Sequence, residues 1–432
     1  MDHSTRREFL GSVGQGMLIA SLGSALASEL GAAAILRSRS GLPDALPFPP
    51  GELELLIRLM QKTSAPELQP KLVEKLKAGT KLETLVAAGA VANARTFGGD
   101  DYQGYHAFMA LMPAYRMAQR MPKGLEALPV LKVLYRSTAR IRAAGKGKEK
   151  LQPVDAVLRA GPAAQMRDKL RARDLPAMEA DFAKRCQGDV AKAYNDLQWL
   201  VQDGLDVHRV VIPWRAWDML QLTGKEYAHT LLRQSVRDCF NREVSRIKSN
   251  HPEPGIRALL PKLLDEHELL AKKAGSKVPE DAWIQELSGT VFGPSRKQAA
   301  EAVAVALAEG FDPDAVGEAI ALAANRLLLH TRNNPRRRDG VHGASVGVHA
   351  SDAANAWRNI ARVTNARNRM TSLIVGAYHT AGQTKDVHKK PLAYVERSEK
   401  LRADDVKKPE ALVKAAEACI RSRDQAGACA AV

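Results

Sequence analysis

Residues 53–60 read Leu-Glu-Leu-Leu-Ile-Arg-Leu-Met, and the apolar positions that recur at three- and four-residue steps are Leu53, Leu56, Ile57 and Met60. This spacing is typical of one face of an α-helix, which has about 3.6 residues per turn. Leu197, Leu200, Val201 and Leu205 repeat the pattern. Alternating runs bounded by hairpin turns are missing, and aromatic residues make up only 5% of the chain. The sequence therefore predicts an all-α protein with about fifteen helices.

The composition is that of a globular protein with a basic surface. Of the 432 residues, 45% are hydrophobic and 26% are charged, which excludes a chain that is mainly disordered. Lys and Arg number 64 against 48 Asp and Glu, so the net charge is +16. Such an excess favours an anionic small molecule or an anionic envelope surface as a partner.

The four cysteines exclude several kinds of protein. They are too few for a disulfide scaffold, and no C-x-x-C or C-x-x-C-H motif occurs, so thioredoxin-type chemistry and covalent haem attachment are not expected. Cys186 and Cys239 lie in helical patterns and are predicted to be buried. Cys419 and Cys429 are close enough in sequence for one local disulfide in an oxidising compartment.

The first residues resemble a bacterial twin-arginine export signal. Ser4-Thr5-Arg6-Arg7-Glu8-Phe9-Leu10 carries the paired Arg6 and Arg7, an apolar run follows, and Ala25-Leu26-Ala27 predicts cleavage after Ala27. The resemblance implies that the twin-arginine translocase is a partner and that the protein is periplasmic or extracellular. That route carries folded proteins, often with a bound cofactor. The alternative is an uncleaved N-terminal anchor.

Four segments follow from these patterns. Residues 1–27 form the signal peptide and residues 28–51 a Pro-rich linker. Residues 52–382 are predicted to form one helical domain. Residues 383–432 are predicted to be a charged connection and a last helix after Pro409.

A weak internal repeat groups the histidines. Residues 79–97 align with residues 310–328, and Gly104-Tyr105-His106 then aligns with Gly340-Val341-His342. A further copy begins at Val207-His208. Each copy reads as a helix, a polar loop and a histidine that opens the next helix. Because paired helices bury their apolar faces on one another, the repeat predicts one compact domain of helix-loop-His-helix units.

Equivalent positions in repeats tend to face a common axis, so His106, His208 and His342 are predicted to converge with nitrogens roughly 3–7 Å apart. Three neutral imidazoles suit Fe, Zn, Cu or Mn. His229 and His330 are predicted to complete the shell, and His349 to line the cavity wall. The alternative for each is a buried or capping histidine.

Carboxylates accompany the predicted metal ligands. Asp206 and Asp339 precede helices and are expected to be N-caps. Asp218 and Asp352 each lie ten residues after a repeat histidine and are the candidate general bases or outer partners of the ligands.

A group of arginines near the third repeat histidine could bind an anion. Arg337 lies in the loop before His342, and Arg358 and Arg362 share a face of the next helix. The alternative is a solvated loop and helix face. Nucleic acid is not expected as a partner, because the chain has an export signal and lacks interleaved aromatic residues.

Two short stretches resemble known histidine-bearing helical proteins. Gly104-Tyr105-His106-Ala107-Phe108 and Val341-His342-Gly343-Ala344 are similar to segments of the questin oxidase-like proteins and of the related helical domains fused to Rieske centres. The resemblance implies an all-helical, oxygenase-like protein. It covers about a tenth of the chain, and no nicotinamide or flavin fingerprint accompanies it.

Two functions follow as expectations. The first is an exported, metal-dependent oxidoreductase whose ion is held by the histidine cluster. The second is a non-catalytic helical binding or scaffold protein of the cell envelope, which the basic charge and the lack of a strict catalytic motif favour.

Overall fold

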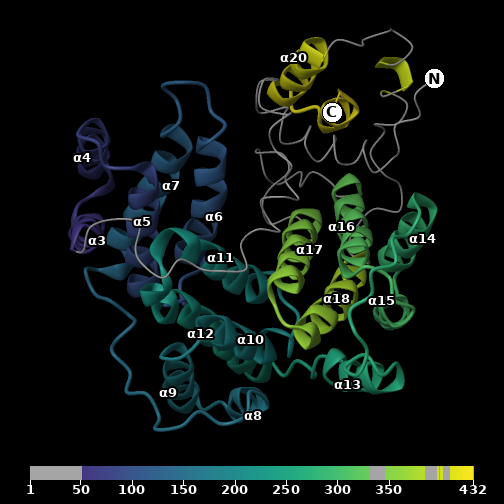
Figure 1. Ribbon diagram of the computed structural model, residues 1–432. Coiled ribbons are helices and arrows are strands. Elements are labelled where there is room, and N and C mark those ends of the chain that lie inside the picture. The colour runs from purple at the N-terminus through teal and green to yellow at the C-terminus, as the bar shows by residue number, and fades with distance from the viewer. Residues whose placement is uncertain (1–50, 331–345, 385–396, 398, 402–408, 432) are drawn as a thin grey trace.

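The computed structural model describes residues 51–330, 346–384, 397, 399–401 and 409–431 (Figure 1). The predicted signal peptide, nearly all of the linker, and Arg337, Asp339 and His342 lie outside the described residues. Helices dominate the described part and no strand occurs in it, which confirms the all-α prediction. None of the helices described is both long and apolar enough to cross a membrane.

The first group of helices surrounds α5, whose Ala-rich sequence is buried on almost every side. Small side chains let neighbouring helices approach α5 closely, and it packs against α3, α6, α7, α11 and α12. The group lies at the left of Figure 1. Its helices are α3 (Glu52–Lys62), α4 (Ala65–Lys77), α5 (Leu82–Phe97), α6 (Tyr102–Ala118) and α7 (Leu128–Arg140), with a π-helical turn at Ile141–Gly145.

The second group is built around α11, which is the central helix of the protein. Only Arg215 and Gln221 of its 17 residues keep appreciable exposure, because α11 packs against α5, α6, α12 and α17. A helix buried on all sides belongs to the core of a large domain. The group comprises α8 (Ala164–Ala172), α9 (Leu175–Cys186), α10 (Val190–Val201), α11 (Val207–Thr223), a 3-10 turn (Lys225–Tyr227) and α12 (Ala228–Lys248).

The third group packs mainly around α16 and α18. It comprises α13 (Ile256–Glu266), α14 (Asp281–Phe292), α15 (Arg296–Ala308), α16 (Pro313–Leu329), α17 (Val346–Val363) and α18 (Ala366–Ala381). Beyond it, α20 begins at Pro409 as expected and ends at Arg421. A second short helix, α21 (Gln425–Ala431), packs on α20, so two described helices stand where one was predicted.

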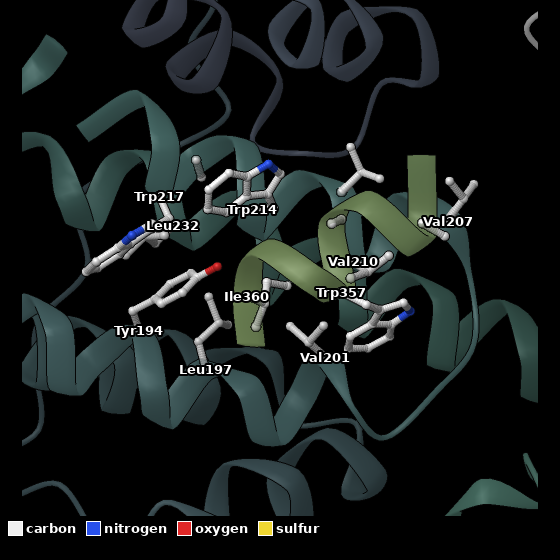
Figure 2. Close-up of a cluster of buried hydrophobic side chains, with 14 of the residues drawn as sticks. Tyr194, Leu197, Val201, Val207, Val210, Trp214, Trp217, Leu232, Trp357 and Ile360 are labelled. Atoms are coloured by element: carbon white, nitrogen blue, oxygen red, sulfur yellow. The ribbon is translucent and has the colours of Figure 1, made fainter. Parts of the chain in front are cut away.

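One apolar cluster joins α17 to α10 and α11 (Figure 2). Trp357 and Ile360 of α17 are almost fully buried beside Val201 and Val210. Tyr194 of α10 stacks on Trp217 of α11 with ring centroids 4.3 Å apart. Trp214 and Trp217 are both buried in this cluster.

The described cysteine side chains are free thiols at Cys186, Cys239 and Cys419. Burial raises the pKa of the Cys186 thiol and of the Cys239 thiol to about 12. Cys239 is buried as predicted, whereas Cys186 is only partly buried. Cys419 has a free thiol, and the side chain of Cys429, its predicted disulfide partner, lies outside what the structure describes.

Candidate metal centre

Two helices run side by side in register and carry the first two repeat histidines. His106 of α6 meets His208 of α11 near the start of both helices, and Arg116 meets Asp218 further along. Both pairs are separated by 102 residues in sequence, so the two helices are parallel. This register places the two imidazoles on facing sides.

The two imidazoles face each other through their Nε2 atoms, which lie 3.1 Å apart. His106 Nδ1 lies 2.5 Å from the carbonyl oxygen of Tyr102, and His208 Nδ1 lies 3.2 Å from Asp206 Oδ1. Carbonyl and carboxylate oxygens only accept hydrogen bonds, so each Nδ1 carries the hydrogen. If both rings are neutral with the hydrogen on Nδ1, their Nε2 lone pairs point at one another, and either a proton or a metal cation between them stabilises the pair.

Asp206 is fixed from several sides. It accepts the backbone N–H of His208 at 2.7 Å, which confirms the N-cap prediction, and binds Arg242 at 2.8 Å. Arg242 in turn donates to buried Asp238. Burial alone would raise the pKa of the Asp206 carboxyl, but the His208 hydrogen bond and the Arg242 charge hold it well below its usual range. Asp206 is therefore an ionised acceptor.

A third helix, α17, adds two polar residues to this place. The His349 ring stands edge-on to His208 with centroids 5.7 Å apart. Asp352 follows one turn later on the same side. Partial removal of water by the surrounding protein raises the pKa of the Asp352 carboxyl. The positive charge of Arg215 opposes this shift, and the imidazoles of His349, His106 and His208 oppose it further. The carboxylate is thus in electrostatic reach of all three rings.

Aromatic rings close the other side of the pair. Tyr102 and Tyr105 lie with ring centroids 4.4 Å and 5.0 Å from that of His106. Tyr105 is buried, and burial raises the pKa of its phenol. Burial also lowers the pKa of His106, helped by the neighbouring imidazoles. The neutral imidazole, the form that binds a metal, is therefore favoured.

The structure brings two of the predicted ligands together and separates others. His106 and His208 meet within the expected distance, whereas His342 lies outside the described residues. His349, expected on the cavity wall, packs directly on His208. The sequence signal for it was the His349-x-x-Asp352 spacing, which puts both side chains on one helix face.

His229 and His330 are placed elsewhere. His229 packs on Phe182 with centroids 6.2 Å apart, because α12 turns that face toward α9, and burial lowers its pKa to about 4. His330 lies on Phe292 at the end of α16. Within the described part of the chain, no group of three or more His, Cys, Asp or Glu side chains is arranged to hold one ion. The described geometry thus offers a pair of imidazoles and not a five-histidine shell.

Asp218 does not face the pair. Its Oδ1 accepts from Arg116 at 2.5 Å and from Gln221 at 2.8 Å, and it lies ten residues along α11 from His208. Ten residues of helix correspond to about 15 Å. The general-base role predicted for Asp218 is thus replaced by an ion pair that joins α6 to α11.

The two predicted anion-binding arginines that the structure describes are already engaged. Arg362 Nε and Nη2 donate to Asp314 at 2.6 Å and 2.9 Å, and Arg358 donates to the same carboxylate at 3.3 Å. These contacts join α17 to α16 and neutralise much of the charge that was predicted to attract a ligand.

Comparison with known proteins finds no matching family, no matching curated protein and no matching solved structure. The fold and the paired imidazoles are therefore the basis for assigning a function.

A buried histidine beside the centre predicts acid sensitivity. His379 of α18 is 8% exposed, its Nδ1 accepts from the Trp357 indole at 3.4 Å, and burial lowers its pKa to about 4. The unfolded chain takes up this proton near pH 6.5, so the stability that the neutral ring contributes is present above pH 6.5 and is lost as the pH falls toward 4. We expect about 3 kcal/mol from this group over that window.

The measurement is urea unfolding of wild type and His379→Gln at pH 7 and pH 4.5. The variant should lose less stability than wild type between the two values. Equal losses in the two proteins would contradict the assignment of acid sensitivity to His379.

Proposed function

We propose that this protein binds one transition-metal ion between His106 and His208 and is an exported, metal-dependent oxidoreductase. The observation that carries the proposal is the pair of Nε2 atoms 3.1 Å apart, each on a ring whose Nδ1 is anchored to an oxygen. Two imidazoles bound to one ion with bonds of about 2.0–2.1 Å, at an angle of about 95°, have nitrogens at this separation.

The hydrogen bonds behind the rings support the same proposal. Histidines that bind metals almost always donate their other ring N–H to a carboxylate or a backbone carbonyl, which fixes the ring and its tautomer. His208 has a carboxylate partner in Asp206, and His106 has a carbonyl partner in Tyr102. Both outer partners are thus already in place.

The third helix supports the redox class. Asp352 of α17 is the carboxylate that we propose as a third ligand, because it lies in electrostatic reach of both imidazoles. Two histidines and one carboxylate with open positions are typical of non-haem iron oxygenases. Zinc, copper and manganese also accept such ligands, and the metal decides between redox and hydrolytic chemistry.

Export is the part of the proposal that the sequence supports. The twin-arginine-like signal with Arg6 and Arg7 favours a protein that folds, and acquires its ion, before it leaves the cytoplasm. The alternative function, a binding or scaffold protein of the envelope, becomes the proposal if the purified protein binds no metal.

Asp206 allows a matched test of the outer hydrogen bond. Asp101 and Asp206 both cap helices and both pair with an arginine, but only Asp206 also accepts from an imidazole. Replacing either with Ala should cost about 1 kcal/mol of stability through the lost cap. Only Asp206→Ala should also weaken metal binding, by about 10- to 100-fold.

The affinities are measured by competition between the protein and a chromophoric chelator for Co²⁺ or Zn²⁺. Asp101→Ala serves as the control, with unchanged affinity expected. Equal affinities in the two variants would show that Asp206 acts only as a cap.

A further inference from the structure

Two arginines from distant parts of the chain each lie within cation–π distance of one tryptophan ring. Arg367 of α18 places its Cζ 3.4 Å from the ring centroid of Trp199 of α10, and Arg167 of α8 places its Cζ 5.2 Å from the same centroid. A guanidinium over an indole gains cation–π attraction, but two guanidiniums at one ring also repel each other. The arrangement brings three helices together around two like charges.

In the described part of the chain, neither guanidinium donates a hydrogen bond to a carboxylate. Arg367 donates to neutral oxygens, Gln202 Oε1 at 3.1 Å and Asn368 Oδ1 at 2.8 Å. Arg167 Nε is buried without a hydrogen bond, and its nearest carboxylate, Asp168, is 3.8 Å away and 63% exposed. In the described ranges of the chain, no carboxylate lies within the 4.0 Å of an ion pair with Arg367.

Other positively charged side chains on α8 have buried carboxylate partners. Arg171, one turn after Arg167 on α8, pairs with buried Asp203, and Lys169 pairs with Asp181 at 3.3 Å. The fold thus places acidic residues close to the nearby positive charges, whereas Arg367 has none among the described residues and Arg167 has only the exposed Asp168, 3.8 Å away. Burial and the Arg167 charge lower the pKa of Arg367 to about 10, which is the electrostatic cost of this arrangement.

We propose that Arg167 and Arg367 form an oxyanion-binding site on Trp199, whose ligand carries a carboxylate or a phosphate group. An oxyanion between the two guanidiniums accepts charge-assisted hydrogen bonds from both and cancels their repulsion. The indole ring supplies an apolar floor that holds the guanidinium planes. The site is separate from the predicted arginines Arg358 and Arg362, and it does not depend on metal binding.

The experiment is calorimetric titration of the purified protein with sodium phosphate and with sodium succinate, at an ionic strength held constant with sodium chloride. Wild type should bind at least one of the two anions saturably. Arg167→Gln and Arg367→Gln should each weaken that binding at least tenfold. The control is Arg421→Gln, which removes the same charge from a side chain that is 73% exposed, and which should bind as wild type does.

Thermal unfolding without ligand adds a second measurement. If Arg367 stabilises the fold, Arg367→Met should unfold at a lower temperature than wild type. If Arg367 serves a ligand, the unfolding temperature of Arg367→Met should equal or exceed that of wild type. If Arg367 variants fail to fold, Arg167→Gln, on the partly exposed face of α8, decides the titration alone.

Each outcome of the titration has one meaning. Saturable binding of phosphate alone assigns a phosphoryl ligand, and binding of succinate alone assigns a carboxylate ligand. Binding of both assigns a general oxyanion site. Absence of saturable binding in wild type, or equal binding in wild type and in both Gln variants, overturns the proposal.

Discussion

Replacement of His106 or His208 with alanine is expected to abolish stoichiometric metal binding. Each variant leaves one imidazole at a place where two Nε2 atoms now lie 3.1 Å apart. Loss of an outer hydrogen-bond partner alone costs about 10- to 100-fold in metal affinity, so loss of a ligand should cost more than about 100-fold. This is the largest functional effect that we expect from any single substitution in the protein.

The test is metal analysis of the wild-type protein and both variants after purification, followed by titration with Co²⁺, whose visible absorption reports the coordination geometry of the bound ion. The control is His251→Ala, an exposed histidine between α12 and α13 that should leave binding unchanged. If wild type retains less than about a tenth of an equivalent and binds no added ion, the metal proposal is wrong, and the scaffold function takes its place.

Replacement of Trp357 with alanine is expected to have the largest effect on stability, a loss of about 3–5 kcal/mol. Trp357 is 1% exposed and is among the largest fully buried side chains. It packs α17 onto α10 and α11 (Figure 2), and α18 approaches it so closely that a Cβ on Gly376 would lie 3.1 Å from the Trp357 Cβ. Removing the indole N–H of Trp357 would also leave the His379 Nδ1 atom without its hydrogen-bond donor.

Urea unfolding followed by circular dichroism measures this loss. Trp357→Phe keeps an aromatic ring and should lose less, and Trp283→Ala removes a half-buried tryptophan at a different place and should also lose less. A loss below about 1 kcal/mol in Trp357→Ala would mean that α17 is held mainly by other contacts. Because α17 carries His349 and Asp352, its attachment also matters for the candidate metal centre.

The helices themselves could be predicted from local patterns. The periodic leucines at residues 53–60 become the buried face of α3, and Asp206 caps α11 as its position suggested. The apolar periodicity of residues 197–205 predicted one helical face, but α10 ends at Val201, so Leu205 lies beyond the helix. Helix ends depend on capping and on the turn that follows, which periodicity does not contain.

The candidate centre was partly predictable. The repeat favoured a common axis, and His106 and His208 do face one another. His349 was predicted only to line the cavity wall, whereas its ring packs against that of His208, a contact that depends on where α17 lies in the fold. Asp218 was predicted to act in catalysis because it lies ten residues after His208, yet ten residues of helix carry it away from the imidazoles to Arg116.

Local sequence establishes that this chain is helical, where many of its helices begin, and which side of each is apolar, because those properties depend on residues within one or two turns. Which helices become neighbours depends on the packing of whole apolar faces against one another. The sequence of one apolar face is compatible with many other faces, so it does not specify its neighbour. Arg167 and Arg367, 200 residues apart, therefore meet over Trp199 without any local signal. The pairing of His106 with His208 likewise needs the parallel register of α6 and α11, which only long-range packing sets.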